Sequence, residues 1–228
     1  MAKGNKEFRL EVPGGNNVVL LHTCCAPCSS AIIECMMKNG ITPVIYYCNP
    51  NIYPQEEYEI RKNECTRYAQ SLGLEIIDAD YDHDNWLEAM KGLENEPERG
   101  GRCLKCFKLR LLRTAEYAMQ RGIKVITTTL ASSRWKSLDQ INEAGLWACR
   151  QVQEAFEMNN NQTVPPDNTV VWWNQNWRKG GLQERRLQII KEYDFYNQRY
   201  CGCEFSMRKD DLTSMQPSLT SDGIDSRE

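Results

Sequence analysis

Cysteine is the residue type with the greatest chemical potential in this sequence. The chain carries 11 cysteines against 2 histidines, and an odd number leaves at least one thiol outside any set of disulfides. In a reducing compartment, closely spaced thiols indicate metal ligands or redox groups rather than a disulfide framework. Seven of the 11 cysteines form three tight groups, which are Cys24, Cys25 and Cys28; Cys103 and Cys106; and Cys201 and Cys203.

The pair Cys103 and Cys106 has the C-x-x-C spacing that lets two thiolates converge on one metal ion or one edge of an iron–sulfur cluster. Its neighbours Arg102 and Lys105 favour thiolates, because nearby positive charge lowers the pKa of a thiol. A thioredoxin-like dithiol shares this spacing. Here, however, a glycine pair precedes the motif and no short βαβ start encloses it.

The adjacent residues Cys24 and Cys25 are a less common pattern. We expect neighbouring side chains to diverge, which suits two irons of a cluster better than one small tetrahedral ion. Together with the C-x-x-C pair they would supply four thiolates, the usual number for a [4Fe–4S] cluster. A Cys₄ zinc site uses the same ligands and is the alternative.

The third group, Cys201-Gly202-Cys203, is typical of a reversible disulfide. One residue separates the two thiols, and glycine permits the turn that brings them together. A disulfide that closes so small a loop is strained, and strained disulfides are the easily reduced ones. The alternative is that both residues are further metal ligands. The remaining cysteines, Cys35, Cys48, Cys65 and Cys149, are expected to be small buried hydrophobes.

Other polar residues offer weaker signals. Six basic residues and no acidic one lie between Arg99 and Arg113, a pattern that predicts contacts with RNA phosphates or a solvated helix face. The histidines His22 and His83 could be either site residues or structural residues. The tryptophans Trp172, Trp173 and Trp177 could either stack on bases or belong to the core.

Strand and helix patterns alternate along the chain. The apolar runs predict strands, and the amphipathic runs with their capping signals predict helices, the first of them after Ser29 and Ser30 as N-caps. Repeated βα units predict an α/β fold with an open, mostly parallel sheet flanked by helices, whose ligands bind at the carboxyl ends of the strands. The predicted strands are 18–22, 42–47, 74–79, 124–130 and 169–173, and the predicted helices are 30–38, 54–72, 85–93, 103–121, 137–157 and 182–195.

Length and composition fit a protein with one main domain. With 228 residues and a net charge of −3, the chain has room for a sizeable core and no generally basic surface. We expect a mobile N-terminal segment over 1–16, a single α/β domain over 17–206 and a polar mobile tail over 207–228. Residues 1–14 lack the apolar stretch of a secretory signal, and no run approaches a membrane span, so a cytoplasmic protein is expected.

Five blocks of this sequence match the pattern of one known family. The blocks are LLHTCCAPCSS (20–30), YYCNPNIYPQEEYEIR (46–61), LENEPERGGRCLKCFKLRL (93–111), TTTLASSRWKS (127–137) and YCGCEFS (200–206). They resemble the QueH-type epoxyqueuosine reductases. The resemblance runs from about residue 18 to residue 206 and includes all three cysteine groups.

The resemblance implies a specific reaction and scaffold. It implies a nucleotide-hydrolase-like (HUP-like) α/β scaffold with an inserted or terminal helical cysteine region. It also implies the last step of queuosine synthesis, in which the epoxide oxygen is removed from epoxyqueuosine at the wobble position of tRNA. The expected partners are tRNA carrying epoxyqueuosine and an electron donor that the sequence does not identify, with no membrane.

The resemblance also implies roles for individual residues. The matching positions assign the [4Fe–4S] ligands to Cys24, Cys25, Cys103 and Cys106, and the redox-active pair to Cys201 and Cys203. A second metal, a mononuclear iron, is implied beside the cluster, with Asp80 and Cys28 as candidate ligands. The basic residues Arg99, Arg102 and Lys105 are candidates for holding the tRNA backbone.

Two alternatives use the same residues. One is a different iron–sulfur enzyme that modifies tRNA on the same scaffold, which product analysis would distinguish. The other is a zinc-stabilised nucleic-acid-binding module, which the metal content would distinguish.

Overall fold

Five short strands form one parallel sheet at the centre of the computed structural model, which describes residues 8–165, 168–196 and 198–207. Their order is β3-β2-β1-β4-β5, and each neighbouring pair is parallel. The predicted α/β class with an open parallel sheet is confirmed. The strands are β1 (Val18–Thr23), β2 (Thr42–Tyr47), β3 (Ile76–Asp78), β4 (Val125–Thr128) and β5 (Val171–Trp172).

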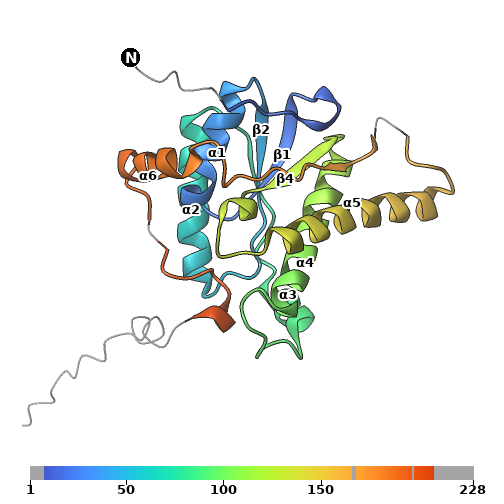
Figure 1. Cartoon of the computed structure of the whole chain (residues 1–228). Helices are drawn as coiled ribbons and strands as arrows, with labels where there is room; N and C mark the ends of the chain where they lie inside the picture. The colour runs from blue at the N-terminus through green and yellow to red at the C-terminus, as the bar shows by residue number, and fades with distance from the viewer. Residues whose placement is uncertain (1–7, 166–167, 197, 208–228) are drawn as a thin grey trace, which may run out of the picture.

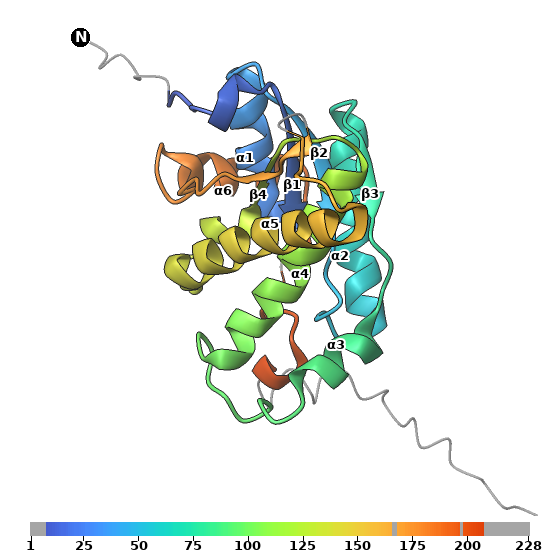
Figure 2. The same cartoon turned by 90° about the vertical axis from the view of Figure 1, so that its right-hand side faces the viewer.

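Helices cover both faces of this sheet, as a parallel sheet requires. In Figure 1, α1, α2 and α6 lie on one side, and α4 and α5 lie on the other. Figure 2 shows α4 and α5 in front of the sheet, with α3 packed on α4. The helices are α1 (Ala26–Lys38), α2 (Gln55–Ser71), α3 (His83–Met90), α4 (Gly101–Gln120), α5 (Leu138–Asn160) and α6 (Leu182–Glu192).

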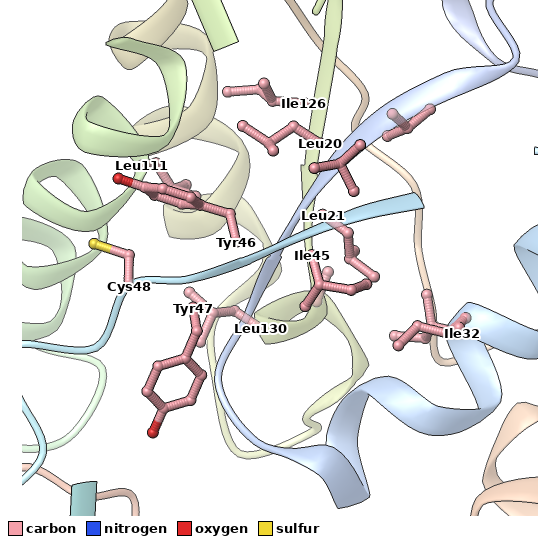
Figure 3. Packing of buried hydrophobic residues seen from close by; sticks show 14 of the residues in the cluster. Leu20, Leu21, Ile32, Ile45, Tyr46, Tyr47, Cys48, Leu111, Ile126 and Leu130 are labelled. Atoms are coloured by element: carbon pink, nitrogen blue, oxygen red, sulfur yellow. The ribbon is translucent and has the colours of Figure 1, made fainter. Parts of the chain in front are cut away.

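Successive residues of β2 pack on opposite faces, which is the period of a strand. Tyr46 and Tyr47 point to opposite sides of β2 (Figure 3). The Tyr46 ring stacks 4.9 Å from that of Tyr117 on α4, whereas the Tyr47 ring lies 5.1 Å from that of Tyr58 on α2. Ile45 shares the second face and points toward Ile32 of α1. The two apolar layers hold the sheet between its helices.

Two predicted boundaries near the cysteines are wrong. Helix α1 begins at Ala26 rather than residue 30, so Ser29 lies inside the helix and donates a hydrogen bond to the carbonyl of Cys25 (3.0 Å). Pro27 permits the earlier start, because proline is well tolerated in the first turn. Strand β4 ends at Thr128, since residues 129–132 form a 3₁₀ turn, η2 (Thr129–Ser132).

Burial decides two other expectations. Trp172, Trp173 and Trp177 are at most 6% exposed, so their prediction as stacking residues is wrong and the core alternative holds. The four scattered cysteines are confirmed as buried, each at most 8% exposed. In the described part of the chain, none of the helices combines the length and apolar character needed to cross a membrane.

The domain boundaries stay a prediction. Part of the expected N-terminal segment contacts the domain, because the Leu10 amide donates to the side chain of Asn39 (3.0 Å) at the end of α1. Of the expected tail, residues 208–228 lie outside the described residues.

Candidate metal and redox site

The first cysteine group lies where the strand order reverses. Strands β1 and β4 are neighbours, and the helices that follow them, α1 and α5, lie on opposite faces of the sheet (Figure 1). Ligands bind at such a point in open α/β sheets. The Cys24 amide, just after β1, donates to the hydroxyl of Thr129, just after β4 (3.2 Å). That hydroxyl lies 3.4 Å from the Cys24 sulfur, to which it donates. The fold therefore holds Cys24 from both strands.

Three thiols converge at this point, and the expected divergence of Cys24 and Cys25 is wrong. Their sulfur atoms are 3.9 Å apart, and the sulfurs of Cys24, Cys25 and Cys28 all lie within 4.8 Å of one another. The backbone explains the geometry, because Cys25 is the extended N-cap of α1 and Cys28 lies three residues further along the helix. The group has the size of a site for one metal ion.

Hydrogen bonds among the three thiols shift their pKa values in opposite directions. Hydrogen bonds from Cys25 and then Cys28 hold the pKa of Cys24 well below its usual range. The pKa values of the two donors rise, that of Cys28 to about 12, because each keeps its proton to donate. The N-terminus of α1 adds positive potential. The arrangement therefore favours the thiolate form at Cys24, and a cation bound by the three sulfurs would release further protons.

The other two cysteine groups line a single pocket. Cys103 and Cys106, in the first turns of α4, meet Cys201 and Cys203 there. The backbone amide of Arg99 donates to the Cys103 sulfur (3.3 Å). Burial raises the pKa of Cys103, and raises that of Cys203 to about 12. The pocket thus joins the C-x-x-C pair to the proposed redox pair.

Two cations, Arg110 and Lys136, interact both with Cys24 and with cysteines of the pocket. Burial alone would lower the pKa of Arg110, but electrostatic interactions with the neighbouring cysteines, Cys106 and then Cys24, together outweigh burial and raise it. The pKa of Lys136 is raised in the same way, because electrostatic interactions with the neighbouring cysteines, Cys201 and then Cys24, outweigh the effect of burial. Arg110 also donates through Nε to the carbonyl of Cys48 (3.1 Å). Positive charge of this kind would stabilise thiolates formed when the cysteines bind a metal or lose their protons.

The structure does not bring every predicted ligand into one group. Among the residues that the structure describes, Cys24, Cys25 and Cys28 are the one set of three or more potential ligand atoms within 4.8 Å. The C-x-x-C pair lies outside that set. Asp80 is exposed, at a positive φ of 54°, and is also outside it.

The Cys201-Gly202-Cys203 turn is anchored through its backbone. The Gly202 carbonyl accepts a hydrogen bond from the Tyr53 amide (2.9 Å). Gly202 has a φ of +109°, a backbone angle that residues with a side chain rarely adopt. A Cβ atom there would lie 2.9 Å from Ile52. The next turn, η4 (Glu204–Ser206), is the red segment near α3 in Figure 1. All cysteines are free thiols in this structure, with Cys201 exposed and Cys203 buried.

Both histidines have structural positions. His22 is fully buried between the Thr128 hydroxyl (2.6 Å) and the Cys48 carbonyl (3.0 Å), and burial lowers its pKa to about 3. It is therefore neutral and ties β1 to its neighbouring strands. His83 contacts the Pro50 carbonyl (2.7 Å) and a Glu204 carboxylate oxygen (3.1 Å), which fastens η4 to α3.

The three basic residues proposed for RNA differ in their exposure. Arg102 is 3% exposed, and its guanidinium donates to the carbonyls of Glu94 (2.7 Å) and Glu96 (2.5 Å). Arg99 is exposed but donates to the carbonyl of Trp135 (2.9 Å). Lys105 is exposed on α4. The structure thus gives Arg102 a loop-organising position and leaves Lys105 facing solvent.

The pocket residues that sequence reasoning did not assign to the site include Arg110, Trp135 and Lys136. Arg110 was assigned to a surface patch, although it follows Cys106 by four residues and so shares its helix face. Trp135 and Lys136 lie in the turn between η2 and α5, where periodicity carries no signal. Their position depends on the sheet bringing that turn beside α4.

The fold and the site define a class: an open α/β sheet protein with thiols gathered at the carboxyl edge of its strands, suited to metal or redox chemistry. The family model described as "Epoxyqueuosine reductase QueH" matches residues 19–209, a span that includes all three cysteine groups. The chain belongs to the QueH family.

Several relatives carry the same name, epoxyqueuosine reductase QueH. A protein of Histophilus somni is 46% identical over 200 residues, which cover 88% of this chain and 76% of the relative. The Haemophilus influenzae protein is 45% identical over 200 residues, which also cover 88% of this chain and 76% of the relative. The Acinetobacter baylyi protein is 44% identical over 201 residues, 88% of this chain and 85% of the relative.

Proposed function

We propose that this chain is an epoxyqueuosine reductase, an oxidoreductase that removes the epoxide oxygen from epoxyqueuosine at the wobble position of tRNA. The family match over residues 19–209 carries the proposal. The thiol-lined pocket at the carboxyl edge of the sheet supports it, because it gathers the residues that reductive chemistry requires. The product is queuosine in tRNA.

The proposed cofactor is a [4Fe–4S] cluster held by Cys24, Cys25, Cys103 and Cys106. The donor set suits it in kind and number, since four thiolates are its usual ligands, and binding would require Cys24 and Cys25 to move apart from their compact group with Cys28. Nearby positive charge would offset the negative charge of the four thiolates. Arg110, whose pKa responds to the charges of both Cys24 and Cys106, provides such charge. When bound, the cluster supplies one-electron transfers. A further mononuclear iron is proposed with Cys28, and with Asp80 as a second candidate ligand.

The reaction balances with the residues of the pocket. Conversion of an epoxide to an alkene takes up two electrons and two protons and releases water. Oxidation of the Cys201 and Cys203 dithiol to a disulfide releases two electrons and two protons, so one turnover consumes one dithiol. A separate electron donor must then restore the thiols. Lys136 lines the same pocket and places positive charge beside the oxygen as its bond to carbon breaks.

Iron, acid-labile sulfide and zinc content, measured on protein prepared without oxygen, tests the cofactor. We expect about four irons and four sulfides, further iron for the second metal, and broad visible absorption. Serine at Cys24, Cys25, Cys103 or Cys106 should abolish the cluster, whereas the matched control Cys35→Ala, a buried cysteine of α1, should retain it. Stoichiometric zinc without sulfide would instead favour the nucleic-acid-binding module, for which the Cys24, Cys25 and Cys28 group provides three ligands.

Product analysis tests the reaction. With a chemical reductant, the wild type should convert epoxyqueuosine in tRNA to queuosine, detected by mass spectrometry of digested nucleosides. Cys201→Ser should lose multiple turnover, and full activity in that variant would refute the role of the dithiol. Lys105→Glu should weaken tRNA binding, because it reverses the charge of an exposed residue on α4. An unchanged affinity would remove Lys105 from the RNA surface.

A further inference from the structure

Trp135 is an unusually placed tryptophan. Its side chain is 72% exposed, whereas four of the other five tryptophans are at most 6% exposed and Trp147 is half-buried. An exposed indole forgoes one of the largest hydrophobic gains available to a side chain. Single exposed apolar residues are common on protein surfaces, so exposure alone assigns no role. The surroundings of Trp135 carry the argument.

The turn that bears Trp135 is held by two arginines. Arg99 donates to the carbonyl oxygens of Trp135 (2.9 Å) and of the preceding residue (2.7 Å). Arg178 donates to the carbonyl oxygens of Ser133 (2.6 Å) and Lys136 (2.7 Å). Four charge-assisted hydrogen bonds fix the backbone of one short turn. The exposed ring is therefore carried by a preorganised support, which reduces the entropy lost when a ligand binds.

Arg99 connects this turn to the thiols. Its φ of +68° is in the left-handed region, which is uncommon for a residue other than glycine. In this conformation its amide donates to the Cys103 sulfur (3.3 Å) while its side chain holds the turn of Trp135. Trp135, Cys103 and Lys136 all line the same pocket. The position of the indole is thus set relative to the site of the proposed chemistry.

We propose that Trp135 is a stacking platform for the base of the nucleotide that enters this pocket, an inference that rests on the proposed function. An enzyme that acts on one nucleotide of an RNA loop must take its base out of contact with its neighbours, and the freed base needs a new stacking partner. An exposed indole at the pocket supplies that partner. The adjacent cation Arg99 suits a phosphate beside that base.

The proposal is tested by measuring the Kd of the wild-type and variant holoenzymes for two RNAs. No reductant is added, so that no turnover occurs. The probes are an anticodon stem-loop RNA carrying epoxyqueuosine and the same RNA with an abasic wobble position. We expect Trp135→Ala to raise the Kd for the intact RNA roughly tenfold and to leave the Kd for the abasic RNA unchanged. Trp135→Phe should retain most of the affinity. The matched control is Leu146→Ala, at a residue of α5 that is 55% exposed and outside the pocket.

Each outcome has one meaning. An equal loss of affinity for both RNAs would overturn the proposal, because Trp135 would then contact another part of the loop, and so would an unchanged Kd for both. Under turnover, Trp135→Ala should raise KM more than it lowers kcat. A wild type that binds the RNA but forms no queuosine would refute the proposed function instead. The binding measurements would still show whether Trp135 contacts the wobble base, because they do not depend on turnover.

Discussion

At the scale of single residues, Arg61 shows how a buried cation can position reactive groups. Its side chain is 3% exposed and pairs with the Glu57 carboxylate at 2.6 Å. Its remaining N–H groups donate to the carbonyls of Tyr200 and Cys201, each at 3.2 Å. Glu57 in turn accepts from the hydroxyl of Tyr196 (2.8 Å). Arg61 therefore fixes the Cys201-Gly202-Cys203 turn through its backbone and leaves both thiols free to react.

Arg61→Met should loosen this turn and leave the buried Glu57 carboxylate without its ion-pair partner. Removal of one partner of a buried ion pair costs about 3–5 kcal/mol of unfolding free energy, because the other charge loses its compensation. We also expect faster maleimide labelling of Cys203, which is 9% exposed in the native structure. Urea unfolding measures the first effect and mass spectrometry of the labelled protein the second.

The double variant Glu57→Gln with Arg61→Met separates the two effects. It replaces the unpaired Glu57 carboxylate with a neutral amide, so part of the lost stability should return. Cys203 should still react quickly, because the hydrogen bonds from Arg61 to the turn are absent in this variant too. Labelling of Cys203 at the wild-type rate in both variants would show that other contacts of the turn suffice.

At the scale of elements, α5 depends on a close approach to β5. A Cβ atom at Gly145 of α5 would lie 2.1 Å from the ring of Trp172. The indole therefore fills the space where a side chain would stand. Its nitrogen donates to the Asn142 side chain (3.2 Å), one turn earlier in α5, which fixes the ring against the glycine.

Gly145→Ala should destabilise the protein, against the usual trend for helices. Alanine within a helix is ordinarily favoured over glycine by about 0.5–1 kcal/mol. Here the new methyl group must displace a packed indole, and overpacking costs about 1–3 kcal/mol or more. A lower urea midpoint is expected, with Leu146→Ala on the exposed side of α5 as the control that should stay within about 0.5 kcal/mol. A midpoint above that of the wild type would show that Trp172 can move freely.

Elements also show what the sequence could predict. The span 42–47 of β2 was predicted to the residue, because a β-branched and aromatic run between turn signals has few competing interpretations. The start of α1 was missed by four residues, since the serines gave a capping signal that Pro27 and the extended Cys25 overrode. That shift matters, because it brings Cys28 one helical turn from the adjacent pair.

At the scale of the whole molecule, convergence of distant segments was only partly predictable. The cysteine groups were visible as spacings, and the βα alternation predicted that Cys24 and Cys25 lie at the carboxyl edge of the sheet. The inward direction of Arg110 and the placement of Lys136 depend on packing of α4 and of the turn before α5. Packing of this kind involves residues far apart in the chain and leaves no local pattern.

Thiol burial across the molecule links stability to alkaline pH. Burial raises the pKa of Cys149 in α5 from its ordinary value of 9.0 to about 12, and burial is also the main cause that raises the pKa of Cys48 to about 11. A raised pKa means that the folded state keeps the proton longer than the unfolded chain. The resulting stabilisation is present below pH 9 and is lost as the pH rises toward the folded-state values.

Cys149→Ala should therefore flatten the alkaline part of the stability curve. At about pH 10.5 the unfolded thiol of the wild type is ionised, and this one group accounts for about 2 kcal/mol of lost unfolding free energy relative to pH 8. The variant begins less stable at pH 8, because it leaves a small cavity, but should lose less between the two values. Urea unfolding at both pH values under reducing conditions measures the difference. Parallel losses in the two proteins would mean that Cys149 titrates alike in the folded and unfolded states, and that burial in α5 does not protect its proton.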